Sequence, residues 1–389
     1  MNVLILFEIG PLGLNIMRCL ADTGIRCYAF STCKAWDVRF SKYCKEYVEC
    51  LDGSFRSCSP ELTEQINRYC IRRKIDCLIP ADYGSALYLS KISSSLIPQV
   101  KMIPLAKTET LERLNSKWEF SLLLKELGIS QPQTHLVENL EQLHSMPVTI
   151  PCVVKPLKGS GRWTGSKIPG SYVKKDHAEY LASAQQGFPL LVQEFIPGMD
   201  FCINLLAVQG KITVSSLQKC VDENRRQFIK SSELLELAQR IVAHTNYQGV
   251  AGIDVRMDQR DGSFKFLECN PRFWGSLRAA KWNGVNFPLE ALNASMGTKM
   301  KEKILSKDCE YVSPFTVLTR LLKGDLPSLK NLPETTYRDL WQIITDPLSC
   351  FISISLSLKD VIRPPMSQAS NVPLGVKESR PQTIPGVTG

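Results

Sequence analysis

The sequence reads GIDVR at residues 252–256 and FLECNPR at residues 266–272, and these two stretches decide the fold. Both stretches alternate apolar and polar residues, as half-buried strands do. Between them lies the pair Asp261-Gly262, which favours a tight turn between two extended segments. The sequence therefore predicts a β-hairpin that turns at about residue 261.

The predicted hairpin gathers oxygen ligands on one face of a sheet. Folding about residue 261 brings Asp254 roughly opposite Glu268. Because side chains alternate along a strand, Glu268 and Asn270 share one face, whereas Cys269 points to the other. Arg272 follows just past them. Hard cations such as Mg²⁺ take ligands of this kind. The alternative is a hairpin whose charges lie in water, which the joint presence of three ligands and an arginine disfavours.

A second group of residues lies upstream of the hairpin. Residues 150–156, IPCVVKP, read as a short buried strand that carries the lysine Lys155. The strand runs into KGSGRWTG at 158–165, where glycines would let backbone N–H groups approach a phosphate. The stretch is neither a Walker loop nor a dinucleotide fingerprint. A flexible surface loop is the alternative interpretation.

A third block, LLVQEFIPGMD, occupies residues 190–200. It reads as an apolar strand that ends in Gln193-Glu194, turns at Pro197-Gly198 and reaches the acid Asp200.

These three blocks, in this order and spacing, resemble the ATP-grasp superfamily, whose members include biotin carboxylase, the large subunit of carbamoyl phosphate synthetase and many carboxylate–amine ligases. The resemblance covers about residues 1–300. It implies an α/β protein in which an ATP-grasp fold follows an N-terminal doubly wound parallel sheet. It also implies ATP and Mg²⁺, or Mn²⁺, as cofactors.

The resemblance implies roles for the nucleotide-binding positions. Lys117 and Lys155 match the two lysines that hold ATP phosphates. Residues 158–165 match the mobile loop that closes over the phosphates, which contributes Gly159, Ser160 and Gly161. The strand end and linker match the part that reads adenine, formed by Gln193, Glu194, Phe195 and Ile196. Asp200 matches the acid that binds ribose.

The resemblance also implies the metal ligands and the catalytic groups. Asp254, Glu268 and Asn270 match the ligands of the metal ions, although many relatives carry Glu at position 254. Arg272 matches an arginine beside the transferred phosphate and, with Lys155, is the predicted catalytic pair.

Composition narrows the class of protein. The chain has 389 residues, enough for two or three domains, and a formal net charge of +9. That charge suits small anionic ligands, and the absence of a dense basic run interleaved with aromatic residues argues against nucleic acid. The fourteen cysteines are scattered without a Cys-x-x-Cys pair, and there are only four histidines, so a zinc site lacks its spacing.

The sequence leads us to expect a cytoplasmic protein. Residues 1–8 have no basic n-region and only a short apolar run, and no stretch approaches the roughly 20 apolar residues of a membrane helix. We therefore expect reduced thiols and no association with membranes.

The course of the chain predicts its domains. Residues 2–7 and 26–30 read as strands, residues 10–13 as a turn and residues 14–23 as a helix, which together open a parallel sheet. Two helices are expected within 107–128, joined at Asn115-Ser116. The domain bounds that we predict are 1–104 for the N-terminal α/β domain, 105–300 for the ATP-grasp domain with a lid at about 135–192 and a metal-binding sheet at 193–300, 301–363 for a mixed C-terminal segment, and 364–389 for a disordered tail.

The resemblance implies an ADP-forming carboxylate–amine ligase, which phosphorylates a small carboxylate and couples it to an amine. A carboxylase or kinase on the same scaffold, or a member that binds without catalysis, stays open as an alternative, and so does a homodimer. Candidates for contact with the acceptor are Arg256, Arg272 and the segment 274–276, with Arg278 as a candidate that could equally be a surface charge.

A first prediction concerns the tail. Because the stretch after about residue 363 is rich in Pro, Ser, Gly and Val and has no periodic apolar face, its removal should leave the melting temperature and ATP binding nearly unchanged. Differential scanning fluorimetry with and without ATP measures both. A fall of many degrees would mean that the tail packs on the core.

Overall fold

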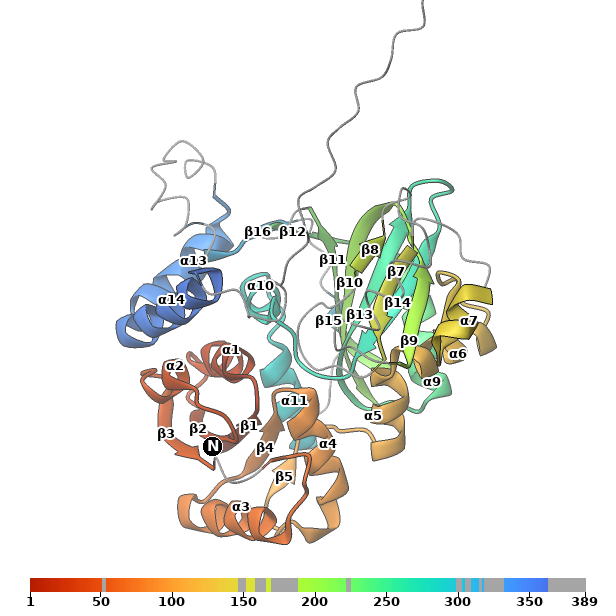
Figure 1. Ribbon diagram of the computed structural model, residues 1–389. Helices are drawn as coiled ribbons and strands as arrows, with labels where there is room; N and C mark the ends of the chain where they lie inside the picture. Colours follow the sequence, from red (N-terminus) through yellow and green to blue (C-terminus); the bar gives the residue numbers. More distant parts are fainter. Residues whose placement is uncertain are drawn as a thin grey trace, which may run out of the picture.

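The computed structural model describes residues 1–50, 54–145, 152–157, 166–168, 188–221, 225–298, 303–304, 309–314, 317 and 332–362. Within these residues the chain forms three β-sheets with helices packed on them (Figure 1). The predicted loop at 158–165 and the predicted tail at 364–389 lie outside the described residues.

The N-terminal sheet is parallel, as the opening of the sequence predicted. Its strand order in the described chain is β3-β2-β1-β4-β5. The strands are β1 Asn2–Phe7, β2 Arg26–Ser31, β3 Cys44–Glu49, β4 Cys77–Pro80 and β5 Lys101–Met102. The helices between them are α1 Gly10–Leu20, α2 Trp36–Arg39, α3 Pro60–Arg73, α4 Tyr83–Lys91 and the 3₁₀ turn η1 Ser93–Ser95.

One prediction for this region is wrong. Residues 10–13 do not form a separate turn but are the first turn of α1, which begins at Gly10. Pro11 is tolerated there because the first N–H groups of a helix have no intrahelical partner.

The second sheet has the strand order β6-β9-β7-β8 in the described chain. Its strands are β6 Thr134–Val137, β7 Cys152–Pro156, β8 Ser166–Ile168 and β9 Leu190–Glu194, and α7 Leu140–Ser145 follows β6. Two helices separate this sheet from the N-terminal one: α5 Thr108–Asn115 and α6 Lys117–Glu126. Their junction at Ser116 is where the sequence placed it.

The third and largest sheet holds the predicted hairpin. Its order in the described chain is β14-β13-β10-β11-β12-β16, and β15 also pairs with β11. Its strands are β10 Gly198–Val208, β11 Lys211–Cys220, β12 Arg225–Ile229, β13 Gly249–Asp258, β14 Phe264–Asn270, β15 Lys303–Ile304 and β16 Cys309–Val312. The remaining helices are α9 Ser232–His244, α10 Leu277–Trp282, α11 Phe287–Ser295, α13 Glu334–Ile344 and α14 Pro347–Ile362.

Alternating burial divides the molecule into layers. In β1, Val3 and Ile5 contact a core that includes α1, whereas Leu4 and Leu6 contact a core with α3 and α4. The apolar face of the third sheet packs on α5, α6 and α9 through a separate core. Its other face meets the core that includes α1 through Leu206, Val214, Phe228 and Val250, and it also carries polar residues.

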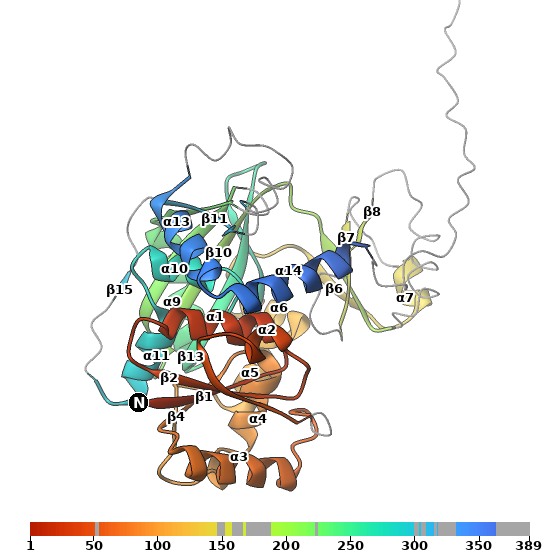
Figure 2. The same cartoon turned by 90° about the vertical axis from the view of Figure 1, so that its left-hand side faces the viewer.

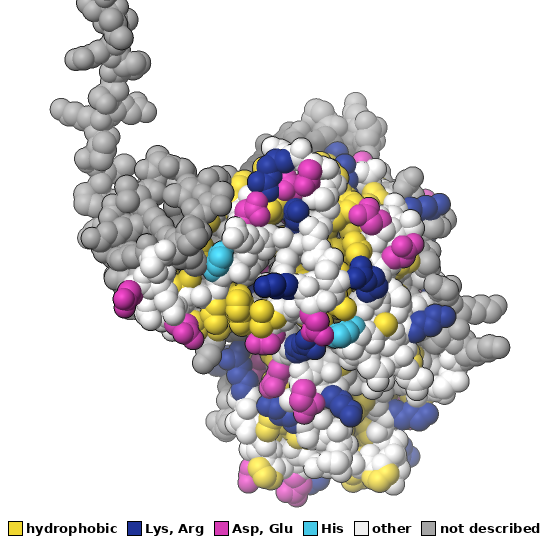
Figure 3. All heavy atoms as spheres, turned by 90° about the vertical axis from the view of Figure 1, so that its right-hand side faces the viewer, with side chains coloured by type: hydrophobic (Ala, Val, Ile, Leu, Met, Phe, Trp, Pro, Cys, Tyr) yellow, Lys and Arg dark blue, Asp and Glu magenta, His cyan; other side chains and the backbone are white. Residues whose placement is uncertain are grey.

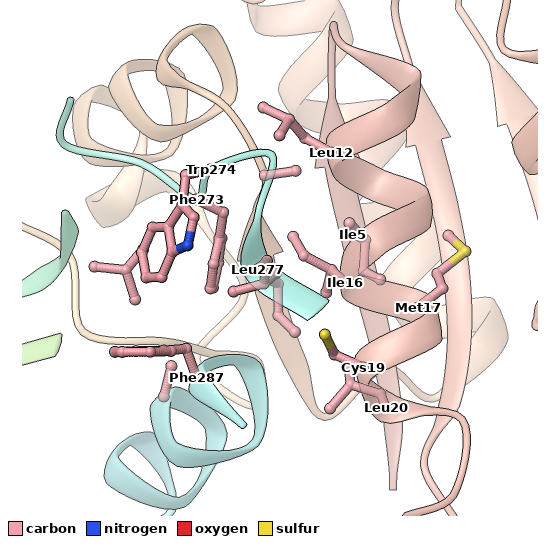
Figure 4. Close-up of a cluster of buried hydrophobic side chains, with 14 of the residues drawn as sticks. Ile5, Leu12, Ile16, Met17, Cys19, Leu20, Phe273, Trp274, Leu277 and Phe287 are labelled. Atoms are coloured by element: carbon pink, nitrogen blue, oxygen red, sulfur yellow. The ribbon is translucent and has the colours of Figure 1, made fainter. Parts of the chain in front are cut away.

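The N-terminal sheet is joined to the end of the third sheet by a shared core (Figure 4). Leu12 and Ile16 of α1 belong to the same buried cluster as Phe273 and Trp274, which follow β14. The Trp274 ring meets the Phe287 ring edge to face, with centroids 4.8 Å apart. The segment that follows the predicted metal ligands is thus anchored by packing.

The C-terminal helices α13 and α14 lie beside α1, α2 and α10 (Figure 2). Buried charges join these parts. Arg18 donates to Asp346 over 3.3 Å, and Ser41 and the backbone N–H of Lys42 donate to the same carboxylate.

Arg278 is not a surface charge. It forms an ion pair of 2.8 Å with the fully buried Asp339 of α13.

Among the described residues, no helix is both long enough and apolar enough to cross a bilayer.

A second prediction tests the buried anchor of the C-terminal helices. Asp346→Ala leaves Arg18 buried without its anionic partner, and the side chains of both residues are almost fully buried. We expect a loss of roughly 3–5 kcal/mol of unfolding free energy, measured by urea denaturation. The matched control is Glu334→Ala, which removes an exposed ion pair with Arg338 and should cost about 0.3–0.5 kcal/mol. Equal effects of the two substitutions would contradict this account.

Candidate active site on the third sheet

The predicted hairpin is present, with one irregularity that the alternation rule did not foresee. Asp254 of β13 pairs with Glu268 of β14, and the register shifts between Asp254 and Val255. Because of this bulge, Phe266 and Cys269, three residues apart, are both buried in the core below the sheet. The bulge thus leaves Glu268 on the polar face while Phe266 fills the core.

Asp254, Glu268 and Asn270 come together, as the sequence predicted. The Asn270 amide donates to Asp254 Oδ2 over 3.2 Å and to Glu268 Oε1 over 3.4 Å. Burial, and then the neighbouring Glu268, raises the pKa of Asp254 to about 6. Two carboxylates that face each other in a partly buried site repel, so the site favours added positive charge.

Three cationic residues from different elements surround this pair. Lys117, at the start of α6, lies 3.5 Å from Glu268. Lys155, on β7, is close enough to influence the pKa of Glu268. Burial acts to raise that pKa, but the charges of Lys117 and Lys155 oppose burial and the pKa is lowered. Arg272 donates to Asn270 Oδ1 over 3.1 Å and to the carbonyl of Phe273.

The donor set fits a hard divalent cation. Asp254 and Glu268 offer carboxylate oxygens, and Asn270 could add a third oxygen ligand. In the structure the nitrogen of the Asn270 amide faces the carboxylates, so ligation by its oxygen requires the amide to turn over and to release Arg272.

Lys155 is a half-buried cation of the predicted phosphate site. Its Nζ donates to Gln193 Oε1 over 3.1 Å, and Gln193 in turn donates to Thr134. Burial lowers the pKa of Lys155, and the charge of Glu268 opposes that effect. Gln193 therefore positions the ammonium group of Lys155 beside the carboxylates. The Gln193 amide uses its oxygen to accept from Lys155 and its nitrogen to donate to Thr134.

The linker after β9 has partners that the sequence did not reveal. Glu194 forms an ion pair of 2.6 Å with Arg260, which also holds the buried Asp258. Gly198 has a φ of +142°, and a Cβ there would lie 1.9 Å from the Met257 carbonyl oxygen, so only glycine fits where the linker joins the sheet.

Arg256, predicted as a candidate for contact with the acceptor, is engaged by the linker after β9. Its guanidinium donates to the Ile196 carbonyl and to Asp200 and lies 5.8 Å from the centre of the Phe195 ring. It therefore belongs with the linker residues that were predicted to read the nucleoside. The cross-strand register explains this, because Arg256 pairs directly with Asp200. Gly159, Ser160 and Gly161 lie outside the described residues.

A row of buried polar residues on the same face was missed. Asn204 pairs with Ser216 on one side and with Gly252 on the other, and Gly252 pairs with Asn270. Within the described chain, Asn204 Nδ2, Ser216 Oγ and the Nε2 of Gln218 have no hydrogen-bond partner, although all three residues are at most 2% exposed. The polar residues at alternate positions of β10 and β11 were the signal in the sequence.

The segment 274–276 divides between core and face. Trp274 is buried, and its indole Nε1 has no hydrogen-bond partner in the part of the chain that the structure describes. Ser276 donates to Gln218 Oε1 over 2.9 Å. Ser276 therefore touches the polar row, and the Trp274 ring lies near Gly252, which stands in the same row.

Comparison with known proteins agrees with this architecture. A family model described as "ATP-grasp in the biosynthetic pathway with Ter operon" matches residues 187–314. The large chain of carbamoyl phosphate synthase from Thermoanaerobacter sp. (strain X514) is 21% identical over 230 residues, which cover 54% of this chain and 21% of that protein. The chain belongs to the ATP-grasp superfamily.

Solved structures of ATP-grasp proteins share the fold. An L-amino acid ligase from Bacillus licheniformis superposes with a TM-score of 0.56 at 16% identity, covering 76% of this chain and 74% of its own. The biotin carboxylase domain of a 2-oxoglutarate carboxylase from Hydrogenobacter thermophilus, solved with MgADP and bicarbonate, gives 0.60 at 14% identity, covering 78% and 71%. The predicted ATP-grasp fold is thus confirmed, whereas the domain bounds stay predictions. The ATP-grasp chain spans about a fifth of the carbamoyl phosphate synthase that it matches.

A third prediction follows from the carboxylate pair. The raised pKa of Asp254 means that its contribution to stability is present below about pH 4 and is lost as the pH rises through about 6. Asp254→Asn removes this loss. We therefore expect a higher melting temperature than the wild type at neutral pH with a chelator present, and a smaller difference at about pH 4.

The control for this prediction is Asp261→Asn. Hydrogen bonds from the side chain and backbone of Ser263 lower the pKa of Asp261, so the sign is opposite and no stabilisation is expected. A lower melting temperature for Asp254→Asn at neutral pH would show that the charged form of Asp254 does not destabilise the folded protein.

Proposed function

We propose that this chain is an ATP-dependent, ADP-forming ligase that phosphorylates a small carboxylate and couples the acyl group to an amine. The observation that carries the proposal is the position of Lys117 and Lys155 on different elements, both directed at the charge of Glu268 beside Asp254. Such a site combines fixed cations with ligands for a metal ion. Phosphoryl transfer needs this combination, because its main demands are positioning and charge neutralisation.

In this proposal Asp254 and Glu268 would hold Mg²⁺ or Mn²⁺, joined by Asn270 once its amide has turned over. The metal would neutralise phosphate charge. Lys155 and Arg272 would hold the transferred phosphoryl group, and Lys117 would contact the phosphates from the side of α6. The hydrogen bonds that join Asn270 to Asp254 and Glu268 bring the three side chains together and support this assignment.

The nucleoside would bind along the linker after β9. Asp200 is exposed and could accept from the ribose hydroxyls, although it is already paired with Arg256. The Glu194 carboxylate is held by Arg260, so adenine would be read chiefly by the backbone at Phe195 and Ile196.

The acceptor carboxylate would bind at the polar row. A buried donor without a partner costs about 1–3 kcal/mol, and a ligand that bears oxygen atoms would remove that cost. Asn204 and Gln218 offer amide N–H groups, and Ser216 offers a hydroxyl. The row lies next to Asn270 through Gly252, on the face that carries Glu268, so a bound carboxylate there would lie near the transferred phosphoryl group.

The donors of the polar row are neutral, so they do not neutralise the negative charge of a bound carboxylate. In this proposal Arg272 would supply the positive charge. A carboxylase is the second candidate, because the Hydrogenobacter neighbour was solved with bicarbonate.

ADP release separates the candidates. The purified chain is incubated with Mg·ATP and a panel of amino acids and small carboxylates, with and without an added amine, and with bicarbonate. A ligase forms ADP and an acyl phosphate from ATP and a carboxylate, and phosphate leaves when the amine attacks the acyl carbon. Hydroxylamine traps the acyl phosphate as a hydroxamate and displaces phosphate in the same way. Release that needs bicarbonate and no amine indicates a carboxylase. Phosphate that stays on an alcohol or amine product indicates a kinase and sinks the proposal.

A fourth prediction concerns Glu268. Glu268→Gln keeps the size of the side chain but removes the charge that faces Lys117 and the metal site. We expect phosphoryl transfer to fall by about 100-fold or more with the confirmed substrate, while ATP still binds. The matched control, Glu46→Gln, breaks ion pairs with Arg72 and Arg73 in the N-terminal domain and should leave turnover unchanged. Full activity of Glu268→Gln would remove Glu268 from the mechanism.

The charge on the surface fits small anionic ligands better than a polyanion. On the face over α6, α7 and α9, basic and acidic side chains of the described residues are interspersed (Figure 3). On this face the basic side chains of the described residues therefore do not form a stripe.

A further inference from the structure

Two cysteines lie beside the carboxylate pair. Cys202 is on β10, and Cys220 is the last residue of β11. The register pairs Cys202 with Gln218, so Cys220 is its diagonal neighbour on the same face. Cys202 also donates to Asp254 Oδ1 over 2.9 Å. The thiol pair is thus in direct contact with a proposed metal ligand.

Cys202 and Cys220 are also more accessible to solvent than most of the other described cysteines. Cys202 and Cys220 are both partly exposed, whereas six other described cysteines are buried: Cys19, Cys27, Cys70, Cys77, Cys152 and Cys269. Cys27 and Cys44 also face each other across neighbouring strands, but Cys27 is buried in the core below α1. Across β12, Cys220 pairs with Arg226, which adds a positive charge on its side.

We propose that Cys202 and Cys220 form a peroxide-sensitive dithiol, a modification site at the edge of the nucleotide-binding face. The Cys220 sulfur attacks hydrogen peroxide, breaks the O–O bond, becomes a sulfenic acid and releases water. The Cys202 sulfur then attacks the Cys220 sulfur and displaces the hydroxyl group as a second water. Two thiols and one peroxide thereby give one disulfide and two waters.

The geometry makes this disulfide reversible. Diagonal neighbours in an antiparallel pair have Cα atoms about 7–8 Å apart. A disulfide prefers about 4.4–6.8 Å, so closure draws β10 and β11 together and leaves a strained bond, which thiols reduce readily.

Disulfide formation also changes the site. It consumes the S–H group that Cys202 donates to Asp254, so the carboxylate loses a hydrogen bond and its strand shifts. Resting on the proposed function, we expect the oxidised protein to turn over Mg·ATP more slowly than the reduced protein.

The first arm of the test needs no enzymatic activity. The full chain, free of nucleotide and metal, is treated with hydrogen peroxide, blocked with N-ethylmaleimide and digested with trypsin. Mass spectrometry should find the peptide that begins at Cys220 linked to the peptide that contains Cys202, and dithiothreitol should release both. In Cys202→Ser, dimedone should label Cys220. Cys50→Ser, which alters another partly exposed cysteine, should not change the linkage.

The second arm measures turnover. Peroxide should lower the ADP release of the wild type at least several-fold, dithiothreitol should restore it, and Cys220→Ser should resist the loss. Cys220 that stays fully alkylated while other cysteines oxidise, or that links to a different cysteine, overturns the proposal. A linked pair in a chain that releases no ADP under any condition would instead overturn the proposed function and leave the dithiol standing.

Discussion

The architecture of the site depends on one cross-strand pair, Asp254 opposite Glu268. Pairing β13 with β14 places two carboxylates face to face, and burial makes their joint charge costly. Two cations from other elements offset this repulsion. They are Lys117 of α6 and Lys155 of the second sheet. The two sheets and α6 are therefore coupled through charge at the point where a metal ion and phosphates would add to the same balance.

Packing below and beside the hairpin keeps that pair in place. Phe266 and Cys269 fill the core under the sheet on either side of the bulge, which leaves Glu268 on the polar face. Trp274 and Phe273 then tie the following segment to α1 and α11, so Arg272 is held between the site and the shared core. The N-terminal sheet and the C-terminal helices support this arrangement through buried ion pairs at Asp346 and Asp339.

The sequence predicted the features that depend on local pattern and spacing. The hairpin, the junction at Ser116 and the opening parallel sheet follow from turn residues, capping and periodicity, and the structure has all three. The bulge was not predicted, because a single extra residue leaves both flanking stretches looking like strands.

The partners of the arginines were not predictable for a different reason. Arg256 and Arg260 hold Asp200 and Glu194, which are 56 and 66 residues away in sequence. Only the register between β10 and β13 reveals the first contact, and only the path of the linker reveals the second. The row of Asn204, Ser216 and Gln218 was visible as alternation on two strands, but its burial required knowledge of what covers that face.

The central claim is that the face bearing Asp254 and Glu268 binds metal and nucleotide together. The most direct measurement is the anomalous diffraction of crystals grown with Mn²⁺ and a non-hydrolysable ATP analogue. The account predicts a manganese peak within bonding distance of a Glu268 oxygen, with the phosphates between it and Lys155. A manganese ion and nucleotide bound elsewhere on the molecule, with Glu268 still paired to Lys117, would contradict it.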